Sequence, residues 1–280
     1  MSDIFYMTGK ATIHVSIMTF PGGEVGVNVN QHQVDPEVDH VTIYARLRDS
    51  NGVMALLLAK DALERVYPFA KFYLRMGYIP YARQDRVCNP GEALSAKVFA
   101  NLINAQKFET VVVIDPHSSV STCLLDRCLV VPQYMVFKNI YRSWDHITIL
   151  APDAGALKKA EEFAQVVNAK GVVHCVKKRN MADGKIIGQE IVNEIDPHGH
   201  YFMLDDICDG GRTFLGVFNA MMEKGFDPAV GKVELAVTHG IFSNENNLNQ
   251  MRGLFHNIHT TDTFRAEADT PDCINVINAL

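Results

Sequence analysis

The stretch that decides the fold is residues 201–213, which read YFMLDDICDGGRT. Residues 201–204 are apolar and predict a buried strand, and a helical pattern begins at Thr213. Two acids and a pair of glycines lie between the strand and the helix. The backbone N–H groups of the glycine turn and the helix N-terminus then meet beyond the strand end, and this arrangement suits a phosphate group.

The two acids, Asp205 and Asp206, suit the vicinal hydroxyls of a sugar. A carboxylate accepts two hydrogen bonds, and its charge strengthens them. The same residues also fit a simpler interpretation, in which the acids cap a turn that Gly210 and Gly211 close. Spacing alone leaves both interpretations open.

The rest of the chain alternates short β-branched runs with helical patterns over residues 12–114, and again over residues 147–238. This alternation predicts an α/β fold of two tandem domains, 1–144 and 145–280, each with a mostly parallel sheet flanked by helices. The predicted strands are 13–20, 41–45, 72–79, 111–114, 147–150, 172–176, 201–204 and 233–237. The predicted helices are 54–66, 92–105, 156–166 and 213–224.

The helix over 92–105 has the clearest predicted start. Asn89 can cap it, Pro90 suits the first helical position, and Glu92 can reach back to the backbone as in a capping box.

The composition is that of a globular protein, with 48% hydrophobic and 21% charged residues among 280. We expect a cytoplasmic protein that neither crosses a membrane nor is secreted, because no basic N-terminal stretch precedes an apolar run. The six scattered cysteines predict reduced packing residues. A formal net charge of -6 argues against nucleic acid as a partner, so an anion must be bound locally.

Several segments resemble a known family. Residues 201–213 resemble the phosphoribosyl diphosphate loop of type I phosphoribosyltransferases. Residues 78–86, YIPYARQDR, and 94–102, LSAKVFANL, resemble the ATP-binding stretch and following helix of ribose-phosphate diphosphokinases, a module that ordinary phosphoribosyltransferases lack. The resemblance runs from about residue 13 to 264 and implies two phosphoribosyltransferase-like domains. The first would bind ATP and the second the sugar phosphate, with the last segment free to pack back on the first.

The resemblance implies an ATP site at Arg83, Gln84, Asp85 and Arg86. Residues 20–24, FPGGE, resemble the hairpin that reaches from a neighbouring subunit to the adenine in that family. Phe20 and Glu24 would then bind ATP, and the protein would be a homo-oligomer whose ATP site is shared between subunits. From the residues alone, an ordinary β-turn explains this segment equally well.

Two further segments imply magnesium. Residues 115–117, DPH, and 151–155, APDAG, resemble family segments whose histidine and aspartate each touch a magnesium ion. His117 and Asp153 would have these roles. So few protein ligands suffice for Mg²⁺, because nucleotide oxygens and water complete its coordination shell.

Residues 176–179, VKKR, resemble the start of the family's flexible catalytic loop. The family's spacing of a lysine, any residue and an arginine fits Lys177 and Arg179, whereas alignment on the Lys-Arg pair selects Lys178, so all three are candidate catalytic cations. Such cations stabilise negative charge that develops in the transition state.

Together these segments imply a magnesium-dependent transferase that moves the β,γ-diphosphate of ATP to the anomeric hydroxyl of a ribose 5-phosphate group and releases AMP. The implied acceptor site comprises Asp205, Asp206, Asp209, Gly210, Gly211, Arg212 and Thr213. The alternatives are a phosphoribosyltransferase that consumes the activated sugar and a non-catalytic regulatory member of the family.

The acceptor loop departs from the family's usual Asp-Thr-Ala/Gly-Gly-Thr. Gly210 and Gly211 open space beside the 5'-phosphate, and Arg212 could meet an additional phosphate. Besides ribose 5-phosphate, an acceptor extended at O5', such as ADP-ribose, therefore fits. Its product, ADP-ribose pyrophosphate, would feed NAD synthesis. Another interpretation has Arg212 pointing into solvent.

Overall fold

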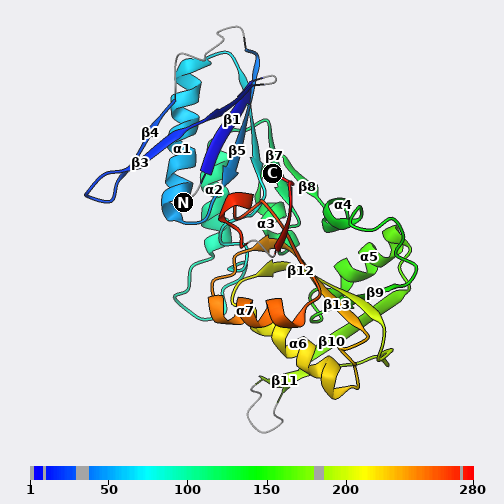
Figure 1. Cartoon of the computed structure of the whole chain (residues 1–280). Coiled ribbons are helices and arrows are strands. Elements are labelled where there is room, and N and C mark those ends of the chain that lie inside the picture. Colours follow the sequence, from blue (N-terminus) through cyan, green and yellow to red (C-terminus); the bar gives the residue numbers. More distant parts are fainter. Residues whose placement is uncertain (1–2, 9–10, 30–37, 180–185, 272–273) are drawn as a thin grey trace. The chain divides into compact units, whose positions relative to one another are not determined.

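The computed structural model describes residues 3–8, 11–29, 38–179, 186–271 and 274–280 (Figure 1). The chain divides into two compact units, residues 1–131 with 279–280 and residues 132–278. The segment before residue 145, which the sequence assigns to the first domain, packs in the second unit because Phe137 and Trp144 are buried beside Phe163 and Phe202. The domain limits 1–144 and 145–280 stay a prediction.

The first unit is built on a six-stranded sheet in the order β2-β1-β5-β6-β7-β8. Strands β5 to β8 are parallel, and β1 runs antiparallel to both β2 and β5. Its strands are β1 (Asp3–Thr8), β2 (Ala11–His14), β5 (His40–Arg46), β6 (Lys71–Met76), β7 (Thr110–Ile114) and β8 (Cys128–Val131). Its helices are α1 (Ser50–Val66), α2 (Ser95–Ala105) and α3 (Ser119–Leu124), and β3 (Ser16–Thr19) and β4 (Val25–Asn28) form a separate hairpin.

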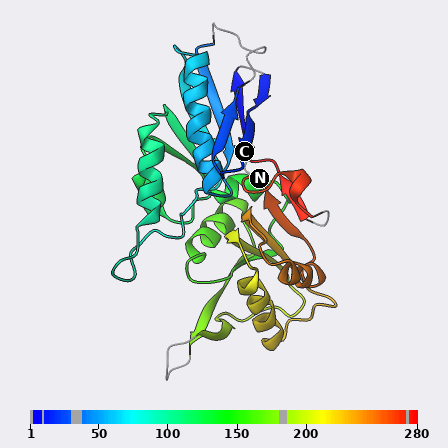
Figure 2. The ribbon, with the colours of Figure 1, turned by 90° about the vertical axis from the view of Figure 1, so that its left-hand side faces the viewer.

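One face of this sheet carries the core of the first unit. Every second residue of β5, namely Val41, Ile43 and Ala45, is buried, as a two-residue side-chain period requires. These side chains pack with Leu56 of α1 and Phe99 of α2, the two helices that lie side by side in Figure 2.

The second unit is built on a seven-stranded sheet in the order β11-β10-β9-β12-β13-β14-β15, parallel except for the antiparallel pair β10–β11. Its strands are β9 (Ile147–Ala151), β10 (Gly171–Arg179), β11 (Ile186–Ile191), β12 (His200–Cys208), β13 (Lys232–Gly240), β14 (Ile258–Thr261) and β15 (Ile274–Ile277). Its helices are α4 (Gln133–Phe137), α5 (Leu157–Val167), α6 (Arg212–Glu223), α7 (Glu245–Leu254) and the short 3₁₀ helix η2 (Glu267–Asp269).

Helices cover both faces of the second sheet. Along β12, Tyr201 and Met203 enter the core that α6 and α7 complete, whereas Phe202 and Leu204 enter the core beside α5. All four side chains are buried. A parallel strand buried on both faces is apolar throughout rather than alternating, which explains the run at 201–204.

Three local predictions were wrong in detail. The predicted strand 13–20 is divided at Val15 into β2 and β3, because residues 11–14 pair with β1 whereas residues 16–19 leave that sheet and pair with β4. The helix predicted over 92–105 begins at Ser95, although Glu92 does accept from the Asn89 N–H at 3.1 Å within a turn.

The third difference concerns the acids. Strand β12 extends to Cys208, because it stays paired with β13 as far as Gly240. Asp205 and Asp206 therefore lie inside the end of the strand rather than in the turn after it.

The C-terminal residues pack on the first unit. The guanidinium of Arg75 in β6 donates to the carbonyl of Ala279 at 2.6 Å.

Among the helices in the described part of the chain, none is long and apolar enough to cross a membrane.

The aromatic core of the second unit yields a stability prediction. The ring of Phe202 lies 5.0 Å from that of Trp144, and Phe202 is fully buried. We expect Phe202→Ala to lower the free energy of unfolding by about 3–5 kcal/mol through lost burial and a residual cavity. The measurement is urea unfolding followed by the fluorescence of Trp144, the single tryptophan of the chain. Phe69→Ala is the control, because Phe69 is 92% exposed, and an equal loss in both variants would contradict the prediction.

Candidate functional site

The carboxyl ends of the parallel strands in the second unit meet at one edge of its sheet. After β9 the chain forms β10 on one side of it and later returns to form β12 on the other side. Such a reversal leaves a crevice outside the strand ends, where open α/β sheets bind ligands. The residues that follow β9 and end β12 therefore border a binding site.

Asp153 lies just beyond the end of β9. Its Oδ1 accepts hydrogen bonds from the N–H groups of Gly155 at 2.9 Å and Ala156 at 3.2 Å. Its Oδ2 is 3.0 Å from the Nζ atom of Lys177, which is carried by β10. Both side chains are partly exposed, 29% for Asp153 and 41% for Lys177, so water can reach this ion pair.

Asp205 and Asp206 form a close acidic pair at the end of β12. Asp206 is buried, Asp205 is half-buried, and the Asp206 N–H donates to Oδ1 of Asp205 at 2.9 Å. Burial, followed by the charge of the Asp206 carboxylate, raises the pKa of Asp205 well above its usual range. A pair of this kind gains stability from a ligand that donates hydrogen bonds, as the hydroxyls of a sugar do.

The loop between β12 and α6 has the geometry of an anion site. Gly211 is the N-cap of α6, has a left-handed φ of 77° and supplies no side-chain cap. The first N–H groups of the helix, in residues 212–214, have no intrahelical acceptors and lie at the positive end of the helix dipole. Arg212 is exposed at the first helical position and has no ion pair among the described residues.

The structure describes only part of the predicted cation cluster. Lys177, Lys178 and Arg179 all lie on β10, and the pairing with β11 shifts register between Lys178 and Arg179. The side chains of Lys178 and Arg179, and all of residues 180–185, lie outside the described part of the chain.

In the first unit, the predicted ATP-binding stretch and the predicted metal ligand come together. Asp85 is buried, and its Oδ1 is 3.0 Å from Nε of the exposed Arg86. Burial alone would raise the pKa of Asp85. The hydroxyl of Ser118 and the charges of Arg86 and His117 lower this pKa by more, so it lies below its usual value. The segment 83–86 and His117 therefore belong to one polar cluster at the carboxyl ends of β6 and β7.

Backbone strain marks this cluster. Asp115, which directly follows β7, and Tyr81, which precedes Arg83, have left-handed φ values of 41° and 63°. Such conformations cost a non-glycine residue about 1–3 kcal/mol and cluster at functional sites. Arg83 and Gln84 are exposed.

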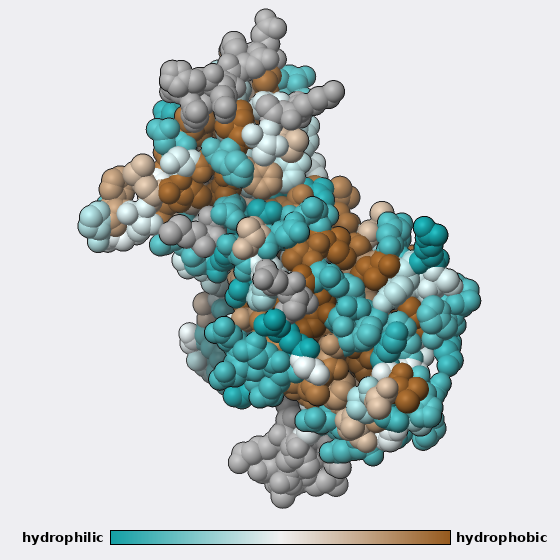
Figure 3. Space-filling view, viewed as in Figure 1, coloured by the Kyte–Doolittle hydropathy of each residue, from teal (hydrophilic) through white to brown (hydrophobic). Residues whose placement is uncertain are grey.

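Phe20 and Glu24 lie at the tip of the β3–β4 hairpin, closed by a hydrogen bond from the Phe20 N–H to the Glu24 carbonyl at 2.8 Å. Phe20 is 50% exposed, as are Met18 on the hairpin at 47% and Met54 on α1 at 50%. Figure 3 shows hydrophobic side chains gathered over this part of the first unit.

The two predicted metal ligands differ in how well they fit Mg²⁺. Asp153 fits, because a partly exposed carboxylate is the oxygen donor that Mg²⁺ prefers, and its Oδ2 contacts the ammonium of Lys177. His117 is exposed but offers nitrogen, a less typical donor for this ion. Within the described ranges, no group of three or more His, Cys, Asp or Glu side chains could hold a metal by itself.

Comparison with known proteins supplies the family. The chain is 29% identical over 235 residues to the ribose-phosphate pyrophosphokinase of Aquifex aeolicus (strain VF5), covering 81% of this chain and 71% of the relative. It is 29% identical over 238 residues to the enzyme of that name from Maricaulis maris (strain MCS10), covering 82% and 72%. No family model matches the sequence. The chain belongs to the ribose-phosphate pyrophosphokinase family.

The fold agrees with this family. The crystal structure of phosphoribosylpyrophosphate synthetase from Mycobacterium smegmatis aligns with a TM-score of 0.78 and 21% identity, covering 96% of this chain and 87% of that one. The predicted α/β fold with parallel sheets is thereby confirmed. As a member of the ribose-phosphate pyrophosphokinase family, the chain is a transferase.

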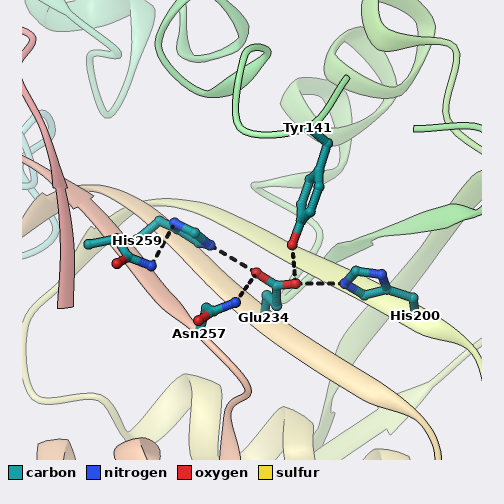
Figure 4. Close-up of polar contacts among 6 residues, drawn as sticks. Tyr141, His200, Glu234, Asn257 and His259 are labelled. Atoms are coloured by element: carbon teal, nitrogen blue, oxygen red, sulfur yellow. Dashed lines mark hydrogen bonds and ion pairs between the residues drawn. The ribbon is translucent and has the colours of Figure 1, made fainter. Parts of the chain in front are cut away.

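This family member also contains a buried polar cluster that no local sequence pattern predicts (Figure 4). The carboxylate of Glu234, on β13, is 1% exposed. It accepts from Tyr141, from Nε2 of His200 at 2.7 Å, from Asn257 at 3.0 Å and from Nε2 of His259 at 2.9 Å. These residues are spread over more than a hundred positions, so only the tertiary structure brings them together.

The cluster yields a prediction about pH. Burial would raise the pKa of Glu234, but the hydrogen bonds from His200, His259, Tyr141 and Asn257 outweigh it and lower the pKa. The unfolded chain therefore binds this proton more readily, so the stabilisation is complete above the unfolded pKa of about 4.3 and is lost as the pH falls below it.

We expect Glu234→Gln to cost about 2–3 kcal/mol at pH 7, and a smaller amount as the pH falls toward 3. The measurement is the urea unfolding curve, followed by Trp144 fluorescence, at several pH values. Glu161→Gln on the exposed face of α5 is the control. A gap between wild type and Glu234→Gln that stays constant from pH 7 to pH 3 would contradict this assignment.

Proposed function

We propose that the chain transfers the β,γ-diphosphate of ATP to the anomeric hydroxyl of a ribose 5-phosphate group. The anomeric oxygen forms a bond to the β-phosphorus of ATP, and the bond from that phosphorus to the oxygen shared with the α-phosphate breaks. AMP leaves with this oxygen, and the hydroxyl proton passes to solvent. No covalent enzyme intermediate is needed.

One observation carries this proposal. The acid pair at the end of β12 is followed within a few residues by the anion loop, residues 209–211, which leads into α6. Asp205 and Asp206 would accept hydrogen bonds from the ribose hydroxyls, and the N–H groups of residues 210–213 would bind the 5'-phosphate. Asp209 and Thr213 border the same loop and complete this predicted subsite. The named relatives act on ribose phosphate, which supports this assignment of the acceptor.

ATP is assigned to the first unit. Arg83 and Arg86 would bind phosphate oxygens, with Asp85 holding Arg86 in place, and Gln84 would contact the nucleotide. Lys177 and one or both of Lys178 and Arg179 would neutralise charge on the transferring diphosphate. Catalysis then consists of positioning and charge stabilisation, as expected for a loose transition state.

His117 would touch one magnesium ion and Asp153 would bind a second near the ribose, and these ions would neutralise phosphate oxygens of the substrates. Lys177 would have to leave Asp153 when the metal binds, and this exchange would release its ammonium for the transferring group. Phe20 and Glu24 at the exposed hairpin tip support a homo-oligomer in which they reach the ATP of a neighbouring subunit.

The acceptor loop favours a substrate larger than ribose 5-phosphate. A Cβ atom added at Gly210 would meet nothing within 4 Å, so the loop leaves open space there. Arg212 is exposed beside it with no ion pair to described residues. A second phosphate attached through O5', as in ADP-ribose, could use both features, and the product would be ADP-ribose pyrophosphate, a precursor for NAD synthesis.

A phosphoribosyltransferase that consumes the activated sugar is the alternative function. It would share the acceptor loop but would not need the cluster of segment 83–86 with His117. A non-catalytic role is disfavoured because the chain is a transferase and retains Asp153 paired with Lys177 at the crevice.

The reaction itself is the first test. With magnesium and ATP, we expect the purified protein to release AMP, not ADP, when ribose 5-phosphate or ADP-ribose is added, with the pyrophosphorylated sugar identified by mass spectrometry. Asp206→Asn should lower kcat/KM by about 10- to 100-fold through the loss of a charged acceptor. Glu223→Gln, an exposed acid at the end of α6, should behave as wild type. Absence of AMP with both acceptors would refute the diphosphokinase reaction.

Arg212 gives a test of acceptor choice. If its guanidinium binds a second phosphate, Arg212→Ala should lower kcat/KM for ADP-ribose about tenfold or more and leave ribose 5-phosphate nearly unchanged. Arg212→Lys keeps the charge and should retain part of the preference. An unchanged ratio of the two acceptors in Arg212→Ala would remove this role.

A further inference from the structure

The anion loop between β12 and α6, residues 209–211, is hydrogen-bonded to the segment that leads into α7. The carbonyl of Asp209 accepts from the Ser243 N–H at 3.0 Å, and the carbonyl of Gly210 accepts from Nδ2 of Asn247 at 2.6 Å. Both donors come from residues 243–247, and α7 packs along α6 beyond them (Figure 1). Two successive carbonyls of the loop are therefore directed toward this segment.

The direction of these carbonyls sets the direction of the loop's N–H groups. A peptide bond is planar and trans, so a carbonyl and the N–H of the next residue point to opposite sides. With the Asp209 and Gly210 carbonyls held by Ser243 and Asn247, the N–H groups of Gly210 and Gly211 point away from α7, and the Gly211 N–H is directed at the buried thiol of Cys208. This orientation keeps the Gly210 N–H on the side where an anion can bind.

Helix α7 also approaches the loop too closely for a side chain. A Cβ atom at Gly211 would lie 2.9 Å from Cε of Met251 and 3.5 Å from Cβ of Asn247. Gly211 has a positive φ as well, so both space and backbone geometry require glycine there. Gly210 is not restricted in this way, because a Cβ atom added there would meet nothing within 4 Å. Its carbonyl accepts the hydrogen bond from Nδ2 of Asn247.

Asn247 is itself fixed. Its N–H donates to Oδ1 of the α7 N-cap Asn244 at 3.0 Å, which places it in the first turn of the helix. Leu248 and Met251, both buried, hold the same helix against the core. The packing of α7 therefore does not depend on the Asn247 amide, and the amide acts on the loop alone.

We infer that Asn247 is a positioning residue for the acceptor, which holds the Gly210–Gly211 peptide and thereby keeps the loop in the conformation in which the Gly210 N–H faces the 5'-phosphate. This inference rests on the proposed function. Without the amide, glycine at 210 leaves the peptide free to rotate, because no side chain restricts it. The 5'-phosphate is remote from the anomeric centre, so its loss weakens binding of substrate and transition state alike.

The test is kinetic. We expect Asn247→Ala to raise the acceptor KM about five- to tenfold, with kcat and the KM for ATP nearly unchanged. Asn247→Asp, which keeps the shape but places an oxygen against the Gly210 carbonyl, should raise the acceptor KM further. Asn249→Ala, on an exposed position of the same helix, is the matched control and should behave as wild type.

A binding measurement separates this inference from the proposed reaction. Inorganic phosphate should raise the thermal unfolding temperature of the wild type and of Asn249→Ala, and raise that of Asn247→Ala much less. If wild type binds phosphate in this way but releases no AMP, the reaction is wrong and the positioning role stands. A fall in kcat with unchanged acceptor KM, or equal phosphate shifts in all three proteins, would overturn the role of Asn247.

Discussion

The parallel pairing of β12 with β13, from His200 and Lys232 to Cys208 and Gly240, is the constraint on which the second unit depends. This pairing keeps β12 extended past its apolar run, so that Asp205 and Asp206 lie in the last part of the strand and not in the turn that follows it. It also fixes where the chain can turn into α6, because the helix must return to cover the face that Tyr201 and Met203 bury. The acid pair and the anion loop therefore share one rigid support.

The same two strands carry a carboxylate near each end, one buried and one half-buried, and the pKa values of the two are shifted in opposite directions. At their start, Glu234 has four donors, which outweigh burial and lower its pKa. At their end, Asp205 has a second acid beside it, and burial with that charge raises its pKa. A carboxylate that is satisfied within the protein stabilises the fold, whereas one left beside a like charge stores unfavourable energy that a hydroxyl-bearing ligand can relieve.

The anion loop shows how a flexible sequence becomes an ordered site. Two adjacent glycines give the backbone freedom to approach a phosphate, but that freedom has an entropic cost when the loop must hold one conformation. Here the segment 243–247 and Met251, more than thirty residues further along the chain, hold the loop by hydrogen bonds and close packing. A short run of sequence thus supplies the shape, and a distant helix supplies the rigidity.

The sequence by itself determined the α/β class, most strands, and the apolar run at 201–204, because side-chain periodicity and turn residues are local properties of the chain. It also placed Asp153, Lys177 and Asp205 at strand ends, where parallel strands bring them to one edge. Tertiary structure alone decided that β12 continues through its acids and that Glu234 and Asn247 find their partners. These features depend on pairing and packing between residues far apart in the chain, and no local pattern encodes them.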